Sequence, residues 1–200
     1  TDKKRFAYQF DYNAQNALLF IMSYGGDWIE PKERKTATVN TEASMKGLQF
    51  MRDLVGKYKV SPKVPEIVAN ALQNQLVVSQ SMNAAGYGNI KSTVKDFKWQ
   101  MFPAPSGPNG TRGTFIGIDF FCINAKSQKA QACMEWFKWF VLNPQTADDL
   151  LNTGFSPSAV KANWEREPLV SNPSYQQVKQ WLTVAKGWTL PYNARVPEFN

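Results

Sequence analysis

The sequence predicts an α/β fold, because segments with strand character alternate with segments of helical periodicity along its 200 residues. The clearest helix is predicted over Gln128–Leu142, where apolar residues repeat at intervals of three and four. The clearest strand is Thr114–Ile123, a near-continuous apolar run interrupted by Gly117 and Asp119. Such a run is typical of a strand with helices on both faces, which is the arrangement in α/β proteins.

Two further helices are predicted in the first third of the chain. Asn13–Ser23 is apolar nearly all round, and Tyr24-Gly25-Gly26 follows it with glycines that can adopt the left-handed conformation of a helix end. Asn40 or Thr41 is a good N-cap for a second helix. The apolar residues of that helix recur on one face, which we expect to pack inward. They are Leu48, Met51, Val55 and Tyr58.

The middle of the chain continues the alternation. A helix over Glu66–Asn74 precedes a strand over Leu76–Met82, and a turn of small residues at 83–89 opens a helix through Ile90–Thr93. A strand over Phe97–Phe102 then runs into a loop at 103–110, where Pro and Gly prevent regular pairing.

The last third of the chain is predicted to be mainly helical. Pro144 occupies the first position of a short helix that extends over Gln145–Asn152, with Gly154 just past its end. Tyr175–Lys186 is a further amphipathic helix, and the tail Gly187–Asn200 has no periodicity.

The composition excludes several kinds of chemistry. The chain has no histidine, so it has no Ser-His-Asp or Cys-His nucleophile and no histidine-ligated metal. Its two cysteines, Cys122 and Cys133, are too few for a zinc site, and we expect both to be buried thiols. We therefore expect no metal, no cofactor and no enzymatic activity.

Charge and hydropathy restrict the partners. The net charge is +7, but the basic residues are dispersed and no nucleic-acid-binding motif is present, so a solvated basic surface is favoured over a nucleic-acid interface. The longest apolar run, Ala17–Met22, is six residues and too short to span a bilayer. The chain starts without the apolar segment of a signal peptide, so it is either cytoplasmic or has its export signal outside the given sequence.

Four segments follow one another in an order that resembles a known family. They are Gly25-Gly26 with Thr38–Ala43 and Gly47–Val55, the passage from Val68 to Gly86, the stretch from Phe102 through Gly117 to Ser127, and Trp136–Leu142 followed by Pro144, Gly154 and Pro157. Together these segments resemble the extracellular solute-binding proteins of ABC importers, specifically the maltose-binding-like family 1 that carries sugars. The resemblance covers nearly the whole chain.

This resemblance implies a periplasmic-binding-protein-like fold of class II. Such proteins have two α/β lobes and are roughly twice as long, which implies that the chain is incomplete and holds mostly the C-terminal lobe plus part of the N-terminal lobe. Residues 1–114 would begin the C-lobe, 115–155 would form the hinge strand and an N-lobe segment, and 156–200 would return to the C-lobe. The apolar faces of Phe120–Ile123 and the Trp136 helix would then need missing chain or another copy to cover them.

The resemblance also implies a function. The protein would capture a sugar or oligosaccharide in a cleft between its lobes and deliver it to the permease subunits of an ABC importer in the membrane. It would be periplasmic or a cell-surface lipoprotein, with no nucleic-acid partner. Aromatic and amide side chains favour a neutral sugar, while Arg195 and the basic charge leave an anionic solute open.

Binding a sugar requires an aromatic ring to stack on the sugar face and polar groups to pair with its hydroxyls. The residues that offer these groups near predicted element ends are Tyr12, Asn13, Gln15, Asn16, Trp28, Gly86, Tyr87, Asn89, Asp119 and Arg195.

Structural roles remain open for the same residues. Asn13 and Asn16 also suit helix capping, Trp28 also suits simple packing, and Asp119 also suits a structural hydrogen bond. Arg195 also suits a solvated surface. The helical spacing of Trp136, Trp139 and Trp181 places them in a core or an interface.

Two other functions compete with transport. One is an enzyme on the same fold with Cys122 as nucleophile, in which Asp119, a lysine or a helix dipole would have to lower the pKa of the thiol. The other is a basic nucleic-acid-binding module. Transport is favoured, because the family-like segments are accompanied by no catalytic constellation.

Overall fold

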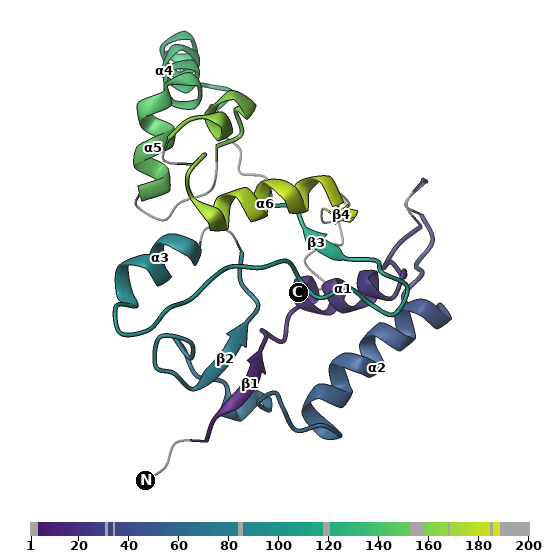
Figure 1. Ribbon diagram of the computed structural model, residues 1–200. Coiled ribbons are helices and arrows are strands. Elements are labelled where there is room, and N and C mark those ends of the chain that lie inside the picture. Colours follow the sequence, from purple (N-terminus) through teal and green to yellow (C-terminus); the bar gives the residue numbers. More distant parts are fainter. Residues whose placement is uncertain are drawn as a thin grey trace. The chain divides into compact units, whose positions relative to one another are not determined.

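The computed structural model describes residues 4–30, 32–33, 35–83, 86–117, 121–152, 158–167, 169–184 and 186–188 (Figure 1). The chain forms two compact units. Unit 1 comprises Thr1–Met82, Pro103–Ile116 and Trp181–Asn200, and unit 2 comprises Asn83–Phe102 and Gly117–Gln180. The division into lobe segments 1–114, 115–155 and 156–200 stays a prediction.

Unit 1 contains two pairs of parallel strands. Strand β1 (Phe6–Gln9) pairs with β2 (Val77–Gln80), and β3 (Gly113–Phe115) pairs with β4 (Lys186–Trp188). Figure 1 shows β1 and β2 side by side, although they are far apart in the sequence. Parallel strands require a long crossover, and the connection from β1 to β2 contains two helices, as expected of an α/β fold.

The two α-helices of this crossover begin where the sequence predicts, and the first also ends at the predicted Ser23. Helix α1 (Ala14–Ser23) starts after Asn13, whose side-chain oxygen accepts from the backbone N–H of Asn16 at 2.9 Å. It ends at Ser23, and the chain turns away two residues later at Gly25, whose φ of 82° lies in the left-handed region. Helix α2 (Glu42–Gly56) starts after Thr41, whose hydroxyl accepts from the N–H of Ser44.

The main core of unit 1 lies on one side of α1. Leu18, Ile21 and Met22 are fully buried there. Partly buried residues from three other segments pack on them, namely Trp28, Leu48 and Phe115. Helices α1 and α2 approach so closely that a Cβ at Gly47 would lie 2.6 Å from the carbonyl oxygen of Phe20. Of the inward-facing residues predicted for α2, Leu48 packs on the buried face of α1. The inward position predicted for Tyr58 is wrong, because Tyr58 lies beyond the end of α2 and is 51% exposed.

The helix predicted over Glu66–Asn74 is wrong. The structure has a short 3₁₀ turn, η1 (Val64–Glu66), followed by irregular turns. Asn70 and Gln75 both have a φ of 55°, which a right-handed helix does not accept. Ala71 is nevertheless buried, and it joins a small core with strand β2 and Phe6.

Unit 2 is mainly helical over its described residues. It contains α3 (Gly86–Thr93), α4 (Ala130–Leu142), α5 (Pro144–Asn152) and the 3₁₀ turn η2 (Lys161–Glu165), together with most of α6 (Pro173–Val184). Pro144 is the first residue of α5, as predicted. Proline suits this position because the backbone N–H of the first helical residue has no acceptor within the helix, so nothing is lost by its absence. No helix in the described ranges is both long and apolar enough to cross a membrane.

Two of the predicted strands differ from the structure. Phe97–Phe102 forms no strand, and its Trp99 packs on Tyr87 of α3 with ring centroids 5.3 Å apart. Of Thr114–Ile123, only the first residues belong to a strand, β3, and residues 118–120 lie outside the described ranges. Trp99 and Phe121 pack on aromatic rings outside any strand ladder, and periodicity alone cannot distinguish such packing from sheet formation.

Helix α4 exposes its aromatic residues. Phe121 stacks against Phe137 at 4.9 Å and also contacts Trp136 and Phe140, yet Trp136 is 48% and Trp139 is 58% exposed. The prediction that these two tryptophans lie in a core is therefore wrong. The alternative prediction, that they lie in an interface, stays a prediction. The prediction that Cys122 is buried is also wrong, because Cys122 is exposed. Cys133 is half-buried. Trp181 in α6 is half-buried.

We expect Gly47→Ala to lower the free energy of unfolding by about 1–3 kcal/mol, because the new methyl group would force α1 and α2 apart. Urea unfolding followed by circular dichroism measures the change. Gly56→Ala in the same helix is the matched control, since no atom lies within 4 Å of the place its new methyl group would take. That control should gain about 0.5–1 kcal/mol from helix propensity. Equal stabilisation by both substitutions would contradict the close helix contact.

We expect Asn13→Ala to lower the free energy of unfolding by about 1 kcal/mol, because α1 loses its N-cap acceptor. Asn13→Asp keeps an acceptor oxygen at the cap and should stay close to the original stability. The same urea titration compares the two variants. An equal loss in both would show that the cap contributes nothing.

Candidate functional site

Four of the predicted ligand-binding residues gather at the start of α1. They are Tyr12, Asn13, Gln15 and Asn16. The Tyr12 hydroxyl donates to the carbonyl oxygen of Pro62 at 2.7 Å, and its ring, 40% exposed, packs on Phe10 at a centroid distance of 5.1 Å. Burial, with a smaller contribution from the Glu66 charge, raises the pKa of Tyr12, so its hydroxyl stays protonated and able to donate.

Asn13 and Asn16 form a local hydrogen-bond pair. The side-chain oxygen of Asn13 accepts both from the backbone N–H of Asn16 at 2.9 Å and from its side-chain amide at 3.0 Å. The side-chain oxygen of Asn16 is buried and has no hydrogen-bond partner in the described part of the chain. The capping role is therefore present, and one buried acceptor beside it stays unpaired.

Trp28 lies beside the second half of α1. Its side chain packs on the core cluster of Leu18, Ile21 and Met22. Its backbone is held as well: the carbonyl of Trp28 accepts from the N–H of Thr38 at 2.7 Å, and the fully buried Ser44 hydroxyl bonds the carbonyl of Asp27 at 2.9 Å. Trp28 thus has the packing role that the sequence left open.

In unit 2, Gly86, Tyr87 and Asn89 occupy the first turns of α3. The Gly86 N–H donates to the carbonyl of Asn83 at 3.1 Å, which forms the turn before the helix. Tyr87 is buried, whereas Asn89 is exposed. The backbone carbonyl of Asn89 accepts from the hydroxyls of Ser92 and Thr93, so it belongs to the helix itself.

Tyr87 is held by two residues from the α6 region. Its hydroxyl accepts from the side-chain amide of Asn172 at 2.7 Å, and its ring meets the ring of Tyr175 at 4.8 Å. Tyr175 is fully buried, and its hydroxyl has no hydrogen-bond partner among the described residues. Burial, with a smaller effect of Tyr87, raises the pKa of Tyr175 above its usual range, so this site keeps a neutral phenol.

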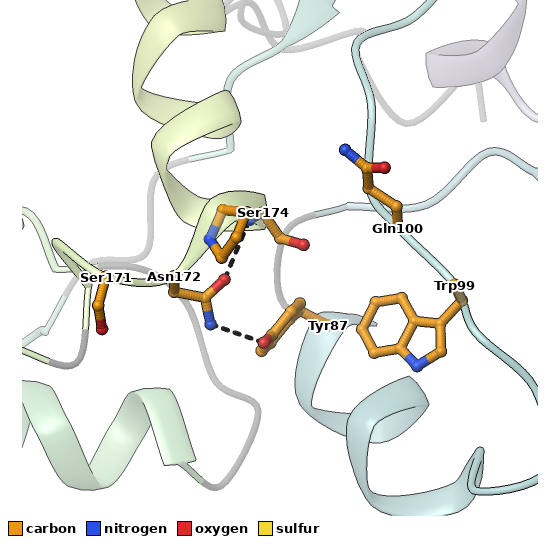
Figure 2. Close-up of a pocket in the computed structure, with 7 residues that line it drawn as sticks. Tyr87, Trp99, Gln100, Ser171, Asn172 and Ser174 are labelled. Atoms are coloured by element: carbon orange, nitrogen blue, oxygen red, sulfur yellow. Dashed lines mark hydrogen bonds between the residues drawn. The ribbon is translucent and has the colours of Figure 1, made fainter.

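A pocket of about 570 Å³ lies next to Tyr87, entirely within unit 2 (Figure 2). All of its lining residues are uncharged: Tyr87, Trp99, Gln100, Ser171, Asn172, Pro173 and Ser174. Asn172 also caps α6, because its side-chain oxygen accepts from the backbone N–H of Ser174 at 3.0 Å. Tyr87 is the one predicted ligand residue in this lining.

The sequence prediction misses Trp99, Gln100 and Asn172. It assigns Trp99 and Gln100 to a strand, and it starts the last helix only at Tyr175. A usable signal exists in Asn172-Pro173, because an asparagine followed by proline is typical of a helix start. The contact between Asn172 and Tyr87, 85 residues apart, has no such local signal.

Two predicted residues, Asp119 and Arg195, lie outside the described ranges. Within those ranges, no three cysteine, aspartate or glutamate side chains gather in a way that could hold a metal ion.

The residues that line the pocket next to Tyr87 offer aromatic surface, amides and hydroxyls to a ligand.

Comparison with known proteins gives one family. The model of the family described as "Bacterial extracellular solute-binding protein" matches residues 2–147. No curated protein matches the chain significantly.

Solved structures match nearly the whole chain. An ABC substrate-binding protein from Listeria monocytogenes in complex with cycloalternan has a TM-score of 0.82 at 14% identity and covers 99% of this chain and 52% of its own. The maltose/maltodextrin-binding domain from Bdellovibrio bacteriovorus, bound to maltotriose, has a TM-score of 0.77 at 20% identity over 97% and 51%. A Mycobacterium tuberculosis protein in complex with glycerophosphocholine has a TM-score of 0.70 at 20% identity over 98% and 49%.

The chain thus spans about half the length of the structures it matches. Their likeness confirms the predicted α/β fold of the periplasmic-binding-protein type. The family model matches residues 2–147, well over half of the 200 residues. The chain belongs to the family of bacterial extracellular solute-binding proteins.

Proposed function

We propose that the protein containing this chain is the substrate-binding component of an ABC importer, which captures a sugar or oligosaccharide and delivers it to a membrane permease. The observation that carries the proposal is the family match over residues 2–147. Matched structures of the same fold hold cycloalternan and maltotriose, which supports a carbohydrate as ligand. The family is described as extracellular, which supports a periplasmic or lipid-anchored location for this protein.

The described side chains at the start of α1 suit carbohydrate chemistry. A sugar presents flat C–H-rich faces and many hydroxyls, so aromatic rings and amides together cover it. Tyr12 supplies an exposed ring there, and Asn13 and Gln15 supply amides beside it.

The ligand-binding residues of the proposal are those that the sequence suggests. They are Tyr12, Asn13, Gln15, Asn16, Trp28, Gly86, Tyr87, Asn89, Asp119 and Arg195. Tyr12 has the best-supported role, because its ring is exposed while its hydroxyl is anchored on Pro62. Trp28 has the weakest support, since its side chain is already used in the core.

No observation favours the competing functions. The solved structures that match the chain are described as binding proteins, which supports a protein without catalytic activity. The thiol of Cys122 is exposed next to the aromatic cluster of α4, and the chain has no histidine to activate it. A solvated surface accounts for the dispersed positive charge.

We expect isothermal titration of the full-length protein with maltose, maltotriose and other neutral sugars to give saturable heat with at least one of them. Tyr12→Ala should weaken that binding by about tenfold, equivalent to about 1.4 kcal/mol, because a sugar face loses its stacking partner.

Tyr58→Ala is the matched control for this titration, since Tyr58 is exposed like Tyr12 but lies outside the proposed site. It should leave the affinity unchanged. Heat with glycerophosphocholine alone, or with none of the sugars tested, would contradict a carbohydrate receptor.

A further inference from the structure

The pocket beside Tyr87 has the size and wall chemistry of a small-ligand site. Its volume of about 570 Å³ falls inside the range of roughly 300–1,000 Å³ that is usual for such sites. Its walls come from three segments: the start of α3, the irregular segment at 99–100, and the turn that leads into α6. Figure 2 shows Gln100 next to Trp99 on one wall, with Asn172 and Ser174 on another.

The lining discriminates against charged ligands. None of its seven residues carries a charge, so the lining offers no ion-pair partner to a phosphate or a carboxylate. The Lys91 ammonium lies 6.0 Å from the centroid of the Tyr87 ring and does not belong to the lining. A neutral ligand is therefore favoured over a phosphate or a carboxylate.

The aromatic wall is already organised. The Tyr87 hydroxyl is bonded to Asn172 at 2.7 Å, and its ring is packed against Tyr175 at 4.8 Å and Trp99 at 5.3 Å. Trp99 itself is only half-buried, so part of its indole faces the open side. Rings that are fixed before binding cost little entropy when a ligand stacks on them.

Polar groups on the walls can receive ligand hydroxyls. The side chains of Gln100 and Ser174 make no hydrogen bond within the described part of the chain. An amide offers both a donor and an acceptor, and a hydroxyl offers the same, which matches the dual character of a sugar hydroxyl. In Figure 2 the Gln100 amide extends from the wall and away from its own backbone.

From these observations we infer that the pocket binds one ring of a neutral, hydroxyl-rich ligand, with Trp99 as stacking surface and Gln100 as hydrogen-bond partner. The ligand class rests on the proposed function. Asn172 acts as a positioning residue that holds Tyr87 while it caps α6. The pocket is formed within one unit, so it can take a ligand without any partner surface from the other unit.

Fluorine NMR of the full-length protein labelled with 5-fluorotryptophan tests the inference directly. Trp99→Phe identifies the Trp99 resonance, and Trp139→Phe identifies that of an exposed tryptophan in the same unit that does not line the pocket. Titration with maltotriose should move the Trp99 resonance saturably and leave the Trp139 resonance in place. Glucose 6-phosphate at the same concentration should move neither.

Gln100→Ala provides a second readout that does not disturb folding, because Gln100 is exposed. It should weaken the maltotriose dependence of the Trp99 shift by about threefold to tenfold, while Lys98→Ala, an exposed neighbour outside the lining, should not change it.

The outcomes separate this inference from the proposed function. Calorimetric binding of a sugar with an unmoved Trp99 resonance, or an unchanged affinity in Gln100→Ala, would overturn the pocket and leave the receptor intact. A saturable Trp99 shift with maltotriose would be sugar binding in its own right and would support both. The absence of both signals would overturn both.

Discussion

The packing of α1 is the constraint on which unit 1 depends. Its face of Leu18, Ile21 and Met22 is fully buried, and α2 can approach it only because Gly47 has no side chain. Since hydrophobic burial is the main stabilising term in folding, this contact outweighs the exposed ion pairs, such as Lys46 with Glu42, whose attraction is screened by water and salt. The same contact orients the start of α1, where Tyr12 and Asn13 lie.

Unit 2 is organised around a different interaction, the pair of tyrosines between α3 and α6. Tyr175 is buried by Tyr87 and by Trp164, with ring centroids 4.8 and 6.3 Å apart respectively. One hydrogen bond from Asn172 then joins the start of α6 to the start of α3. The pocket exists because these segments are held together at one point and diverge toward Trp99 and Gln100.

Several polar residues serve structure and remain compatible with binding. Asn13 caps α1, yet its neighbour Asn16 retains a buried acceptor without a partner among the described residues. Asn172 caps α6 and also bonds Tyr87. Preorganisation of this kind is what a receptor for a neutral solute requires, because such a ligand offers hydroxyls and C–H faces but no charge to anchor it. The absence of charge in the pocket lining agrees with the sugars held by two of the matched structures.

Local patterns in the sequence were sufficient for α1, α2 and α4, because caps and helical periodicity act over a few residues. Local patterns could not decide the turns around Asn70, the irregular segment at Trp99 or the exposure of Cys122. Those features depend on what packs against each segment. Likewise, Tyr87 could be singled out from the glycines beside it, whereas its contact with Asn172 could not. Contacts between residues 85 positions apart arise only when the chain is folded, since no local periodicity encodes them.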